Sequence, residues 1–476
     1  MTTMSPIPEK VLALARGIRD AGGRGLLVGG CVRDVLMGEQ PKDWDLEVYG
    51  IDPARLRSML DQFGPVNVVG EAFTVYKLGS NPGVSLDVSI PRRERKAGRG
   101  HRAFVIEGDP EMPVEEATRR RDFTINAILQ DPLTDEVIDP FKGQDDIRSG
   151  VLRAVAPDTF PEDSLRVLRA AQFAARFEFR IHPATVELCR TIDLSDLPSE
   201  RIWGEMEKLL LLARHPSIGI GWLQALNVLE QLFPEIQALI GVPQDPEWHP
   251  EGDVFVHTRL VLDRARELID DLPFAKQVTV MLGALAHDFG KPATTEFLEG
   301  RWRSRGHEEA GVEPTQTFLD RLKVHTLDGY DVRGQVIALV RDHLKPGEFY
   351  KKRAEVGDGA FRRLARKCEL ELLYRVARAD SLGRNTEQTP REQWYTAEAQ
   401  EWFIERAREL AVDHHPPAPI LLGRHLLELG LEPGPRMGEI TRAVYEMQLD
   451  GRVRTLSDAT DFVKSLLSTD STDYSD

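Results

Sequence analysis

The first third of the chain alternates short apolar runs with stretches of helical spacing. Apolar runs at 25–28, 46–49, 74–78 and 85–90 have the length of β-strands, and more polar segments separate them. Strands that alternate with helices are typical of a sheet with helices packed against it. The pattern therefore predicts a mixed α/β domain that ends near Leu152.

Beyond this part the pattern becomes helical and stays so. The segments 164–177, 200–213 and 220–233 each place apolar residues three and four positions apart, which is the spacing of an amphipathic helix. A proline-rich break at 243–250 and a charged stretch at 386–392 divide the helical part. We therefore predict four domains, at 1–152, 153–242, 243–385 and 386–476, the last with a disordered acidic end.

Composition indicates a globular protein without a membrane segment or a disulfide framework. Of the 476 residues, 41% are hydrophobic and 29% are charged, and no apolar run approaches the length of a membrane span. Residues 1–25 look like a leading amphipathic helix and not like a signal peptide. Cys31, Cys189 and Cys368 lie far apart without metal-ligand spacing, which favours reduced thiols. We expect a cytoplasmic protein, and a homodimer is compatible with the sequence.

The net charge of −16 argues at first against a polyanionic partner, because phosphate neutralisation dominates affinity for nucleic acid. Positive charge is nevertheless concentrated in the first third, at 91–102 and at Arg119 to Arg121. Such runs are usually solvated surface, although they can also contact RNA. The distribution of charge therefore leaves an RNA partner open.

A double glycine follows the first apolar run. Gly29 and Gly30 let backbone amides approach a phosphate without an intervening Cβ, and the fork of the Arg33 guanidinium can hold phosphate oxygens. A Gly-Gly turn alone is usually only a turn. Its significance depends on the carboxylates that come next.

Asp43 and Asp45 stand two apart on the next expected strand, so both side chains point to one face while Trp44 packs behind. Two convergent carboxylates suit Mg²⁺. Asp87, in the apolar run 85–90, is the expected third, although it could also be an ordinary exposed strand residue. In two-metal catalysis such carboxylates hold ions that activate a 3′-hydroxyl and shield a triphosphate. These parts predict metal-dependent nucleotidyl transfer.

The segment 26–49 closely resembles the head of class II tRNA nucleotidyltransferases and bacterial poly(A) polymerases, whose fold belongs to the DNA polymerase β superfamily. Cys31 stands where these enzymes usually have Ser, Ala or Thr. The nine residues RRRDFTINA, at 119–127, match the family's second motif almost letter for letter. The resemblance implies a nucleotide site that contains Gly29, Gly30, Arg33, Asp34, Arg121, Asp122 and Asn126.

The first helix after the head carries the residues that the resemblance assigns to base recognition. We expect Glu162 and Asp163 in its first turn, where the helix dipole favours carboxylates in any protein. By resemblance, Asp163 and Arg166 hydrogen-bond the base edge of CTP or ATP in place of a nucleic-acid template, and Arg169 completes the set. Gln172 stands where close relatives usually have a phosphate-facing Arg, which puts one triphosphate contact in question.

A second constellation lies in the helical part. The sequence HDFGKP, at 287–292, ends an expected helix, and His257 and Asp380 stand before and after it. This order resembles the HD phosphohydrolases, in which distant His and Asp residues converge on a divalent metal. The resemblance implies Ni²⁺, Mn²⁺, Co²⁺, Mg²⁺ or Zn²⁺ at His257, His287, Asp288 and Asp380. His307 and His343 could add ligands or bind phosphate, although a lone histidine is more often structural.

A class II head followed by an HD domain resembles the multifunctional CCA enzymes of bacteria. It implies Mg²⁺-dependent, template-independent addition of CCA to tRNA from CTP and ATP, with phosphohydrolase activity in the HD domain. Residues 430–453 resemble a tail element that would hold the tRNA elbow. A poly(A) polymerase, or a partial CC- or A-adding enzyme, would share the head motifs. An HD hydrolase with a binding-only head would have no need of three carboxylates.

Overall fold

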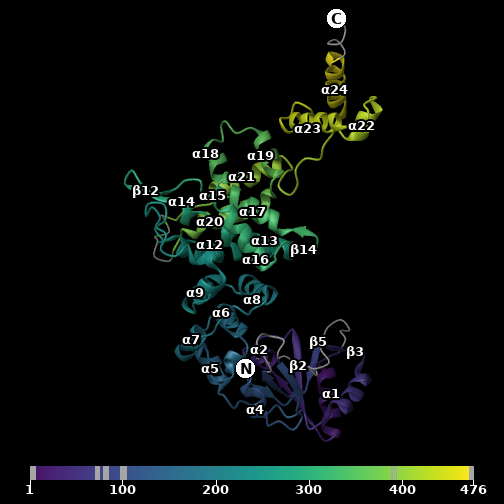
Figure 1. Cartoon of the computed structure of the whole chain (residues 1–476), viewed down its shortest axis with the longest axis vertical. Helices are drawn as coiled ribbons and strands as arrows, with labels where there is room; N and C mark the ends of the chain where they lie inside the picture. The colour runs from purple at the N-terminus through teal and green to yellow at the C-terminus, as the bar shows by residue number, and fades with distance from the viewer. Residues whose placement is uncertain are drawn as a thin grey trace. The chain divides into compact units, whose positions relative to one another are not determined.

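The computed structural model describes residues 7–69, 75–78, 85–96, 104–386, 390, 392 and 394–470. Contacts divide the chain into two compact units, Met1–Phe233 and Pro234–Asp476, and Figure 1 colours them from purple to teal and from teal to yellow. Residues 97–102, the second half of the basic segment, and the acidic end after Asp470 lie outside the described residues. Within the described ranges, no helix is both long and apolar enough to cross a membrane.

The first unit begins with an α/β part and continues into helices. Its strands are β1 (Arg24–Val28), β2 (Asp43–Tyr49), β3 (Val66–Val69), β4 (Val75–Leu78), β5 (Ser85–Ser89), β6 (Arg92–Lys96), β7 (Phe104–Gly108), β8 (Leu129–Gln130), β9 (Val137–Ile138), β10 (Val151–Leu152) and β11 (Arg180–Ile181). Its helices are α1 (Glu9–Asp20), α2 (Gly30–Leu36), α3 (Pro53–Leu60), α4 (Val114–Arg119), α5 (Gly143–Ser149), α6 (Leu165–Phe177), α7 (Pro183–Arg190), α8 (Ser199–Leu212), α9 (Pro216–Ala225) and α10 (Val228–Leu232), with 3₁₀ turns η1 (Asp61–Phe63), η2 (Thr124–Asn126) and η3 (Phe160–Glu162).

A seven-stranded sheet with the order β3-β4-β5-β2-β1-β8-β9 forms the head. Strands β2 and β5 pair in parallel at its centre, and the other neighbours pair antiparallel. The four predicted strands are confirmed as β1, β2, β4 and β5. The central parallel pair fixes the position of the predicted carboxylates, because it aligns Asp45 with Asp87.

The larger apolar cluster of the sheet lies on the face that α1, α2 and α3 cover. Trp44, Leu46 and Val48 of β2 are buried there in one cluster with Leu14 of α1 and Leu56 of α3. Because successive strand residues point to opposite faces, the residues between them lie on the other face of the sheet. The predicted packing of Trp44 behind the two aspartates is confirmed.

Helices α6, α8 and α9 pack against one another after the head. The predicted helices at 164–177 and 200–213 are confirmed as α6 and α8. The segment 220–233, which we expected to be a single helix, is divided between α9 and α10. Asn227 at the break has a φ of 60°, in the left-handed region that ends helices.

The second unit is helical apart from two small hairpins. Its helices are α11 (Pro234–Gln237), α12 (Val254–Arg266), α13 (Phe274–Ala286), α14 (Lys291–Thr294), α15 (His307–Ala310), α16 (Val312–Leu322), α17 (Val332–Asp342), α18 (Lys345–Lys351), α19 (Asp358–Ala365), α20 (Leu370–Gly383), α21 (Glu398–Glu409), α22 (Gly423–Glu428), α23 (Pro435–Leu449) and α24 (Leu456–Asp470). The hairpins are β12 (Thr295–Leu298) with β13 (Arg301–Ser304), and β14 (Thr326–Leu327) with β15 (Tyr330–Asp331).

Helix α13 is the centre of this unit. Ten of its residues are buried, and it packs against α12, α17 and α20. Such a helix is apolar almost all round, as a central helix must be. Farther along the chain, α22, α23 and α24 share a small core of their own around Leu426, Val444 and Val463.

Candidate active site and metal centre

The carboxylates of the head converge as the strand alternation predicted. Asp45 and Asp87 are direct partners across the parallel strands β2 and β5, and Asp43 lies two residues before Asp45 on the same face. Asp45 and Asp87 are partly exposed and Asp43 is exposed, so this face is open to a ligand. The Nζ atom of Lys77 lies 3.2 Å from Asp87 Oδ2.

The electrostatics of this face favour a bound cation. Burial, together with repulsion from Asp87 and Asp43, raises the pKa of Asp45 to about 6, against the opposing attraction of Arg121. A divalent cation among the three carboxylates would remove the repulsion and stabilise the charged form. Oxygen ligands of this kind fit Mg²⁺.

The glycine turn places the backbone directly over these carboxylates. Gly29 has a φ of 73°, and a Cβ there would lie 3.0 Å from Arg121 Nη1 and 4.0 Å from Asp45 Oδ2. The Nη2 atom of Arg121 lies 3.6 Å from Glu47 Oε1, and Glu47 also accepts a hydrogen bond of 2.6 Å from Tyr49. Sequence reasoning missed Glu47, although its position two residues beyond Asp45 was a signal that it shares the same face.

Arg33 and the residues of the second motif form a buried polar network. Arg33 is 4% exposed, donates to Asp34 and to Asn126 Oδ1 at 2.7 Å, and lies over the ring of Phe177. Asn126 in turn donates to Asp122 at 3.0 Å. The structure therefore joins four of the predicted nucleotide-binding residues, Arg33, Asp34, Asp122 and Asn126, to one another.

The network continues from the head into α6 and α8. Arg169 donates to Asp122 Oδ2 at 2.8 Å and lies 3.9 Å from Glu205, which the sequence did not single out. Although burial opposes it, the Arg169 guanidinium lowers the pKa of Asp122. Gln172, also on α6, is 1% exposed, so the side chain at this position lies in the interior.

The structure corrects the start of α6. Glu162 belongs to the 3₁₀ turn η3, Asp163 is extended with φ −129° and ψ 102°, and the helix begins only at Leu165. Our expectation that both carboxylates lie in the first helical turn is therefore wrong. Asp163 instead lies just before the helix, and its carboxylate accepts a hydrogen bond of 3.2 Å from the amide of Leu165, the first residue of α6.

The predicted base-reading pair has separate partners in this structure. Asp163 Oδ2 pairs with Arg201 at 2.9 Å, and Glu162 pairs with Arg120 at 3.2 Å. Arg166 donates to the backbone carbonyls of Thr159 and Arg120 at 2.7 and 2.6 Å. Asp163 and Arg166 are therefore held by separate neighbours and not by each other.

The four predicted HD residues converge in the second unit. They are His257 on α12, His287 and Asp288 directly after α13, and Asp380 on α20. His257 Nε2 lies 3.1 Å from Asp380 Oδ1 and 4.0 Å from Asp288 Oδ2, and His287 Nε2 lies 3.2 Å from Asp288 Oδ2. All four residues are at least nine-tenths buried. The structure places ligand atoms of His257, His287 and Asp288 close enough to share one metal ion.

His307 and His343 join the same centre. The Nε2 atom of His307 lies 3.4 Å from Asp288 Oδ1 and 3.1 Å from the Nε2 atom of His343. Asp288 therefore belongs to two adjoining groups of potential ligands. Although burial opposes it, the neighbouring His287 and Lys291 hold the pKa of Asp288 well below its usual range.

The tautomers of three histidines fit a metal. His287, His307 and His343 each bind a carbonyl oxygen through Nδ1, and these oxygens belong to Ala284, Ser304 and Val340 at 2.7–2.8 Å. A carbonyl only accepts, so each Nδ1 carries the proton and, in a neutral ring, each Nε2 presents a lone pair. Two lone pairs 3.1 Å apart repel, so His307 and His343 need a shared proton or a bound cation. This donor set fits a divalent transition metal.

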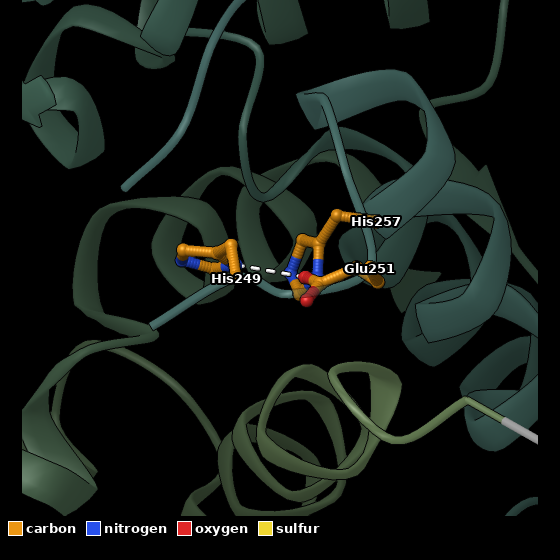
Figure 2. Close-up of side chains that lie close together, drawn as sticks. All are labelled: His249, Glu251 and His257. Carbon is orange, nitrogen blue, oxygen red and sulfur yellow. Dashed lines mark hydrogen bonds and ion pairs between the residues drawn. The ribbon is translucent and has the colours of Figure 1, made fainter. Parts of the chain in front are cut away.

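A third group stands behind His257, and the sequence did not identify it as a site. Glu251 Oε1 lies 2.7 Å from His257 Nδ1 and 2.8 Å from His249 Nδ1, so its carboxylate joins the two rings, as Figure 2 shows. A carboxylate on the far nitrogen of a ligating histidine fixes the orientation of the ring. Lys291 Nζ lies 2.8 Å from Asp288 Oδ2.

Comparison with known families agrees with this division of sites. A family described as the poly A polymerase head domain matches residues 26–153, and one described as the HD domain matches residues 254–385. Between them, residues 178–240 match a family described as the probable RNA and SrmB-binding site of polymerase A. This chain therefore carries matches to a polymerase head and to an HD domain.

Whole-chain comparisons give relatives with the same combination. The multifunctional CCA protein of Xanthomonas oryzae is 39% identical over 372 residues, which cover 75% of this chain and 85% of that protein. The multifunctional CCA protein of Xylella fastidiosa is 38% identical over 326 residues, which cover 67% of this chain and 73% of that protein.

Solved structures show the same fold at lower identity. A CCA-adding enzyme in complex with CTP has a TM-score of 0.63 at 19% identity, covering 97% of this chain and 96% of that one. The Thermotoga maritima CCA-adding enzyme in complex with tRNA has a TM-score of 0.58 at 20% identity, covering 97% of both chains. The predicted fold class, a polymerase β-type head followed by helical domains with an HD domain, is confirmed.

Proposed function

Because the chain belongs to the multifunctional CCA protein family, we propose that it adds C, C and A to the 3′ ends of tRNA, with CTP and ATP as substrates and no nucleic-acid template. The observation that carries this proposal is the alignment of Asp45 with Asp87 across two parallel strands, with Asp43 on the same face. A poly(A) polymerase would have the same three carboxylates on its sheet. It would not explain the sequence identity to multifunctional CCA proteins across both units.

We assign the chemistry of the head to this carboxylate face. Mg²⁺ held by Asp43, Asp45 and Asp87 would supply the positive charge that stabilises the attacking 3′-oxygen and the departing pyrophosphate. Arg121, which lies against Gly29 and within reach of Glu47, is placed to bind the triphosphate beside the glycine turn. We place this reaction in the cytoplasm.

We assign base selection to Asp163 and Arg166. Arg166 donates to the carbonyls of Thr159, directly before η3, and of Arg120 in the second motif, so its guanidinium connects α6 to the head. Release of Asp163 from Arg201 would free the carboxylate for the amino group that C and A share. Each lost base contact should then cost about 1–3 kcal/mol of discrimination.

We assign a metal-dependent phosphohydrolase activity to the second unit. The observation that favours it is the pair of facing Nε2 atoms of His307 and His343 beside the buried Asp288. A transition metal bound there would supply a Lewis acid and an activated water for hydrolysis of a phosphate ester. A terminal 2′,3′-cyclic phosphate is the substrate that links this activity to repair of tRNA ends.

One experiment separates the polymerising alternatives. Purified protein is incubated with Mg²⁺ and tRNA that ends before, within or after CCA, with each nucleotide supplied separately. A CCA-adding enzyme stops at the complete CCA, a poly(A) polymerase extends all three substrates with ATP, and a partial enzyme extends only one of them. An HD hydrolase with a binding-only head extends none.

A further inference from the structure

Exposed aromatic side chains stand on segments that are linked to the His-Asp centre of the second unit. Among the described residues, five Phe and Trp side chains are exposed: Trp248, Phe274, Phe297, Trp302 and Trp394. Water-exposed aromatic groups in one place are unusual on a globular surface unless they bind something. All of these except Phe274 belong to segments that contact the centre or its immediate supports.

Phe297 and Trp302 face each other across the β12–β13 hairpin. They are register partners, 60% and 37% exposed, and their ring centroids lie 5.1 Å apart. The next pair on the same face, two residues along the hairpin, is Thr295 and Ser304, and Ser304 provides the carbonyl that orients His307. The rise of a strand puts the aromatic pair about 7 Å from that pair, a span comparable to one nucleotide.

Trp248 stands on another segment that is linked to the same centre. It is 53% exposed and directly precedes His249, which holds Glu251 behind His257. Arg301 of the hairpin lies 2.6 Å from Glu247, so the hairpin is tied to the segment that carries Trp248. The hydroxyl of Tyr395, next to Trp394, donates to the Glu247 carbonyl at 2.8 Å.

Guanidinium groups stand on the same hairpin as the two aromatic rings. Arg301 and Arg303 are paired with Glu247 and Glu299, while Arg305 is exposed two residues before His307. Aromatic rings beside guanidinium groups are the usual means of holding single-stranded RNA, because every base offers a flat face for stacking. A protein partner would be expected to meet a larger continuous apolar patch than two rings and a separate indole.

From these contacts we propose that Phe297 and Trp302, assisted by Trp248, form a stacking surface for the last bases of an RNA whose terminal phosphate enters the His-Asp centre. The proposal rests on the phosphohydrolase activity assigned above and adds its substrate class: a single-stranded RNA 3′ end and not a free small phosphate ester. The HD centre would then distinguish RNA ends by their bases as well as by their phosphates.

The test compares two cyclic phosphates with the full-length, Mn²⁺-loaded protein. One is a short single-stranded RNA that ends in a 2′,3′-cyclic phosphate, and the other is glycerol 1,2-cyclic phosphate, which has no base. In the double variant Phe297→Ala, Trp302→Ala, the ratio of kcat/KM for RNA to that for the base-free ester should fall about 5- to 100-fold, mainly through KM. Trp302→Phe should retain most of the ratio, because a ring remains.

Phe274→Ala is the matched control, since it removes an exposed ring at the start of α13, outside the β12–β13 hairpin. It should keep the wild-type ratio. Binding of a fluorescent RNA with a 3′-phosphate, measured by anisotropy, should weaken by the same factor in the double variant. The proposal would be overturned if the double variant kept wild-type RNA affinity and an unchanged kcat/KM ratio. These rings would then be expected to contact a protein partner.

The two proposals fail separately. If the wild type hydrolyses neither substrate but the double variant loses RNA affinity, the assigned hydrolase activity is wrong and the stacking surface stands. If the wild type hydrolyses both substrates and the double variant binds RNA normally, only the stacking surface is wrong.

Discussion

Gly290 lies where the loop after the His-Asp pair passes against the segment that carries His307. A Cβ atom at Gly290 would lie 1.9 Å from the His307 carbonyl oxygen and 2.5 Å from the Gly311 amide nitrogen. The backbone angles of Gly290, φ −84° and ψ −16°, are open to any residue. The effect of Gly290→Ala should therefore come from contact alone.

The magnitude follows from these distances. A carbon and an oxygen need roughly 3 Å or more between them, so the two backbone segments must separate by about 1 Å. Both obstacles are backbone atoms and no flexible side chain can give way. Overpacking costs about 1–3 kcal/mol in a typical core, and we expect the upper end of that range, which lowers the melting temperature by about 6–12 °C in a unit of this size.

The same displacement should weaken metal binding. It separates His307 from Asp288, whose nearest atoms are 3.4 Å apart, and changes in ligand geometry typically reduce affinity about 10- to 100-fold. Co²⁺ titration followed by visible absorption measures the affinity, and differential scanning calorimetry with and without metal measures stability. CCA addition by the head reports whether the rest of the protein remains active.

Gly347→Ala is the matched control, because a Cβ there meets nothing within 4 Å on helix α18. Alanine in a helix should leave metal affinity unchanged and should stabilise the unit slightly, by about 0.4–1 kcal/mol. Wild-type Co²⁺ affinity and an unchanged melting temperature in Gly290→Ala would refute the reasoning, since they would mean that this close approach does not exist in the protein.

Further substitutions test the two sites and the network between head and helices. Asp45→Asn should reduce incorporation of labelled CTP by several orders of magnitude while tRNA affinity in a filter-binding assay changes little; a near wild-type rate would remove Asp45 from the site. Asp122→Asn should destabilise the first unit by roughly 3 kcal/mol in urea unfolding, because it removes the nearest carboxylate of Arg169 and leaves that guanidinium with only the more distant Glu205. Asp158→Asn is the control and should cost little, because Asp158 forms an exposed pair with Arg119. His287→Ala should eliminate metal-dependent cyclic-phosphate hydrolysis and spare CCA addition; loss of both would indicate one coupled site. Burial lowers the pKa of His343 to about 3 and that of His249 to about 4 in the folded chain. As the pH falls below about 6.5, the unfolded chain therefore takes up protons on these two rings before the folded chain does. The metal-free second unit should therefore lose stability between about pH 6.5 and 4, by up to about 1.4 kcal/mol per pH unit for each histidine, and a flat melting temperature over this range would contradict the neutral, buried state of both rings.

Local sequence determined the features that depend on the period of a single element. The alternation of Asp43, Trp44 and Asp45 already gave two carboxylates on one face and an indole on the other, because strand geometry leaves no other arrangement. The apolar stretch before His287 similarly predicted a helix that ends at the His-Asp pair. The order of motifs was also sufficient to identify the family.

Tertiary structure decided the partners of each polar group. Nothing local to Arg33 indicates that it is buried over Phe177 and bound to Asn126, and nothing local to Asp163 indicates that it pairs with Arg201. The facing rings of His307 and His343 and the carboxylate of Glu251 behind His257 likewise depend on how separate helices and loops pack. Their distances are set by the positions of whole elements, whereas sequence periodicity fixes only the direction in which each side chain leaves its own element.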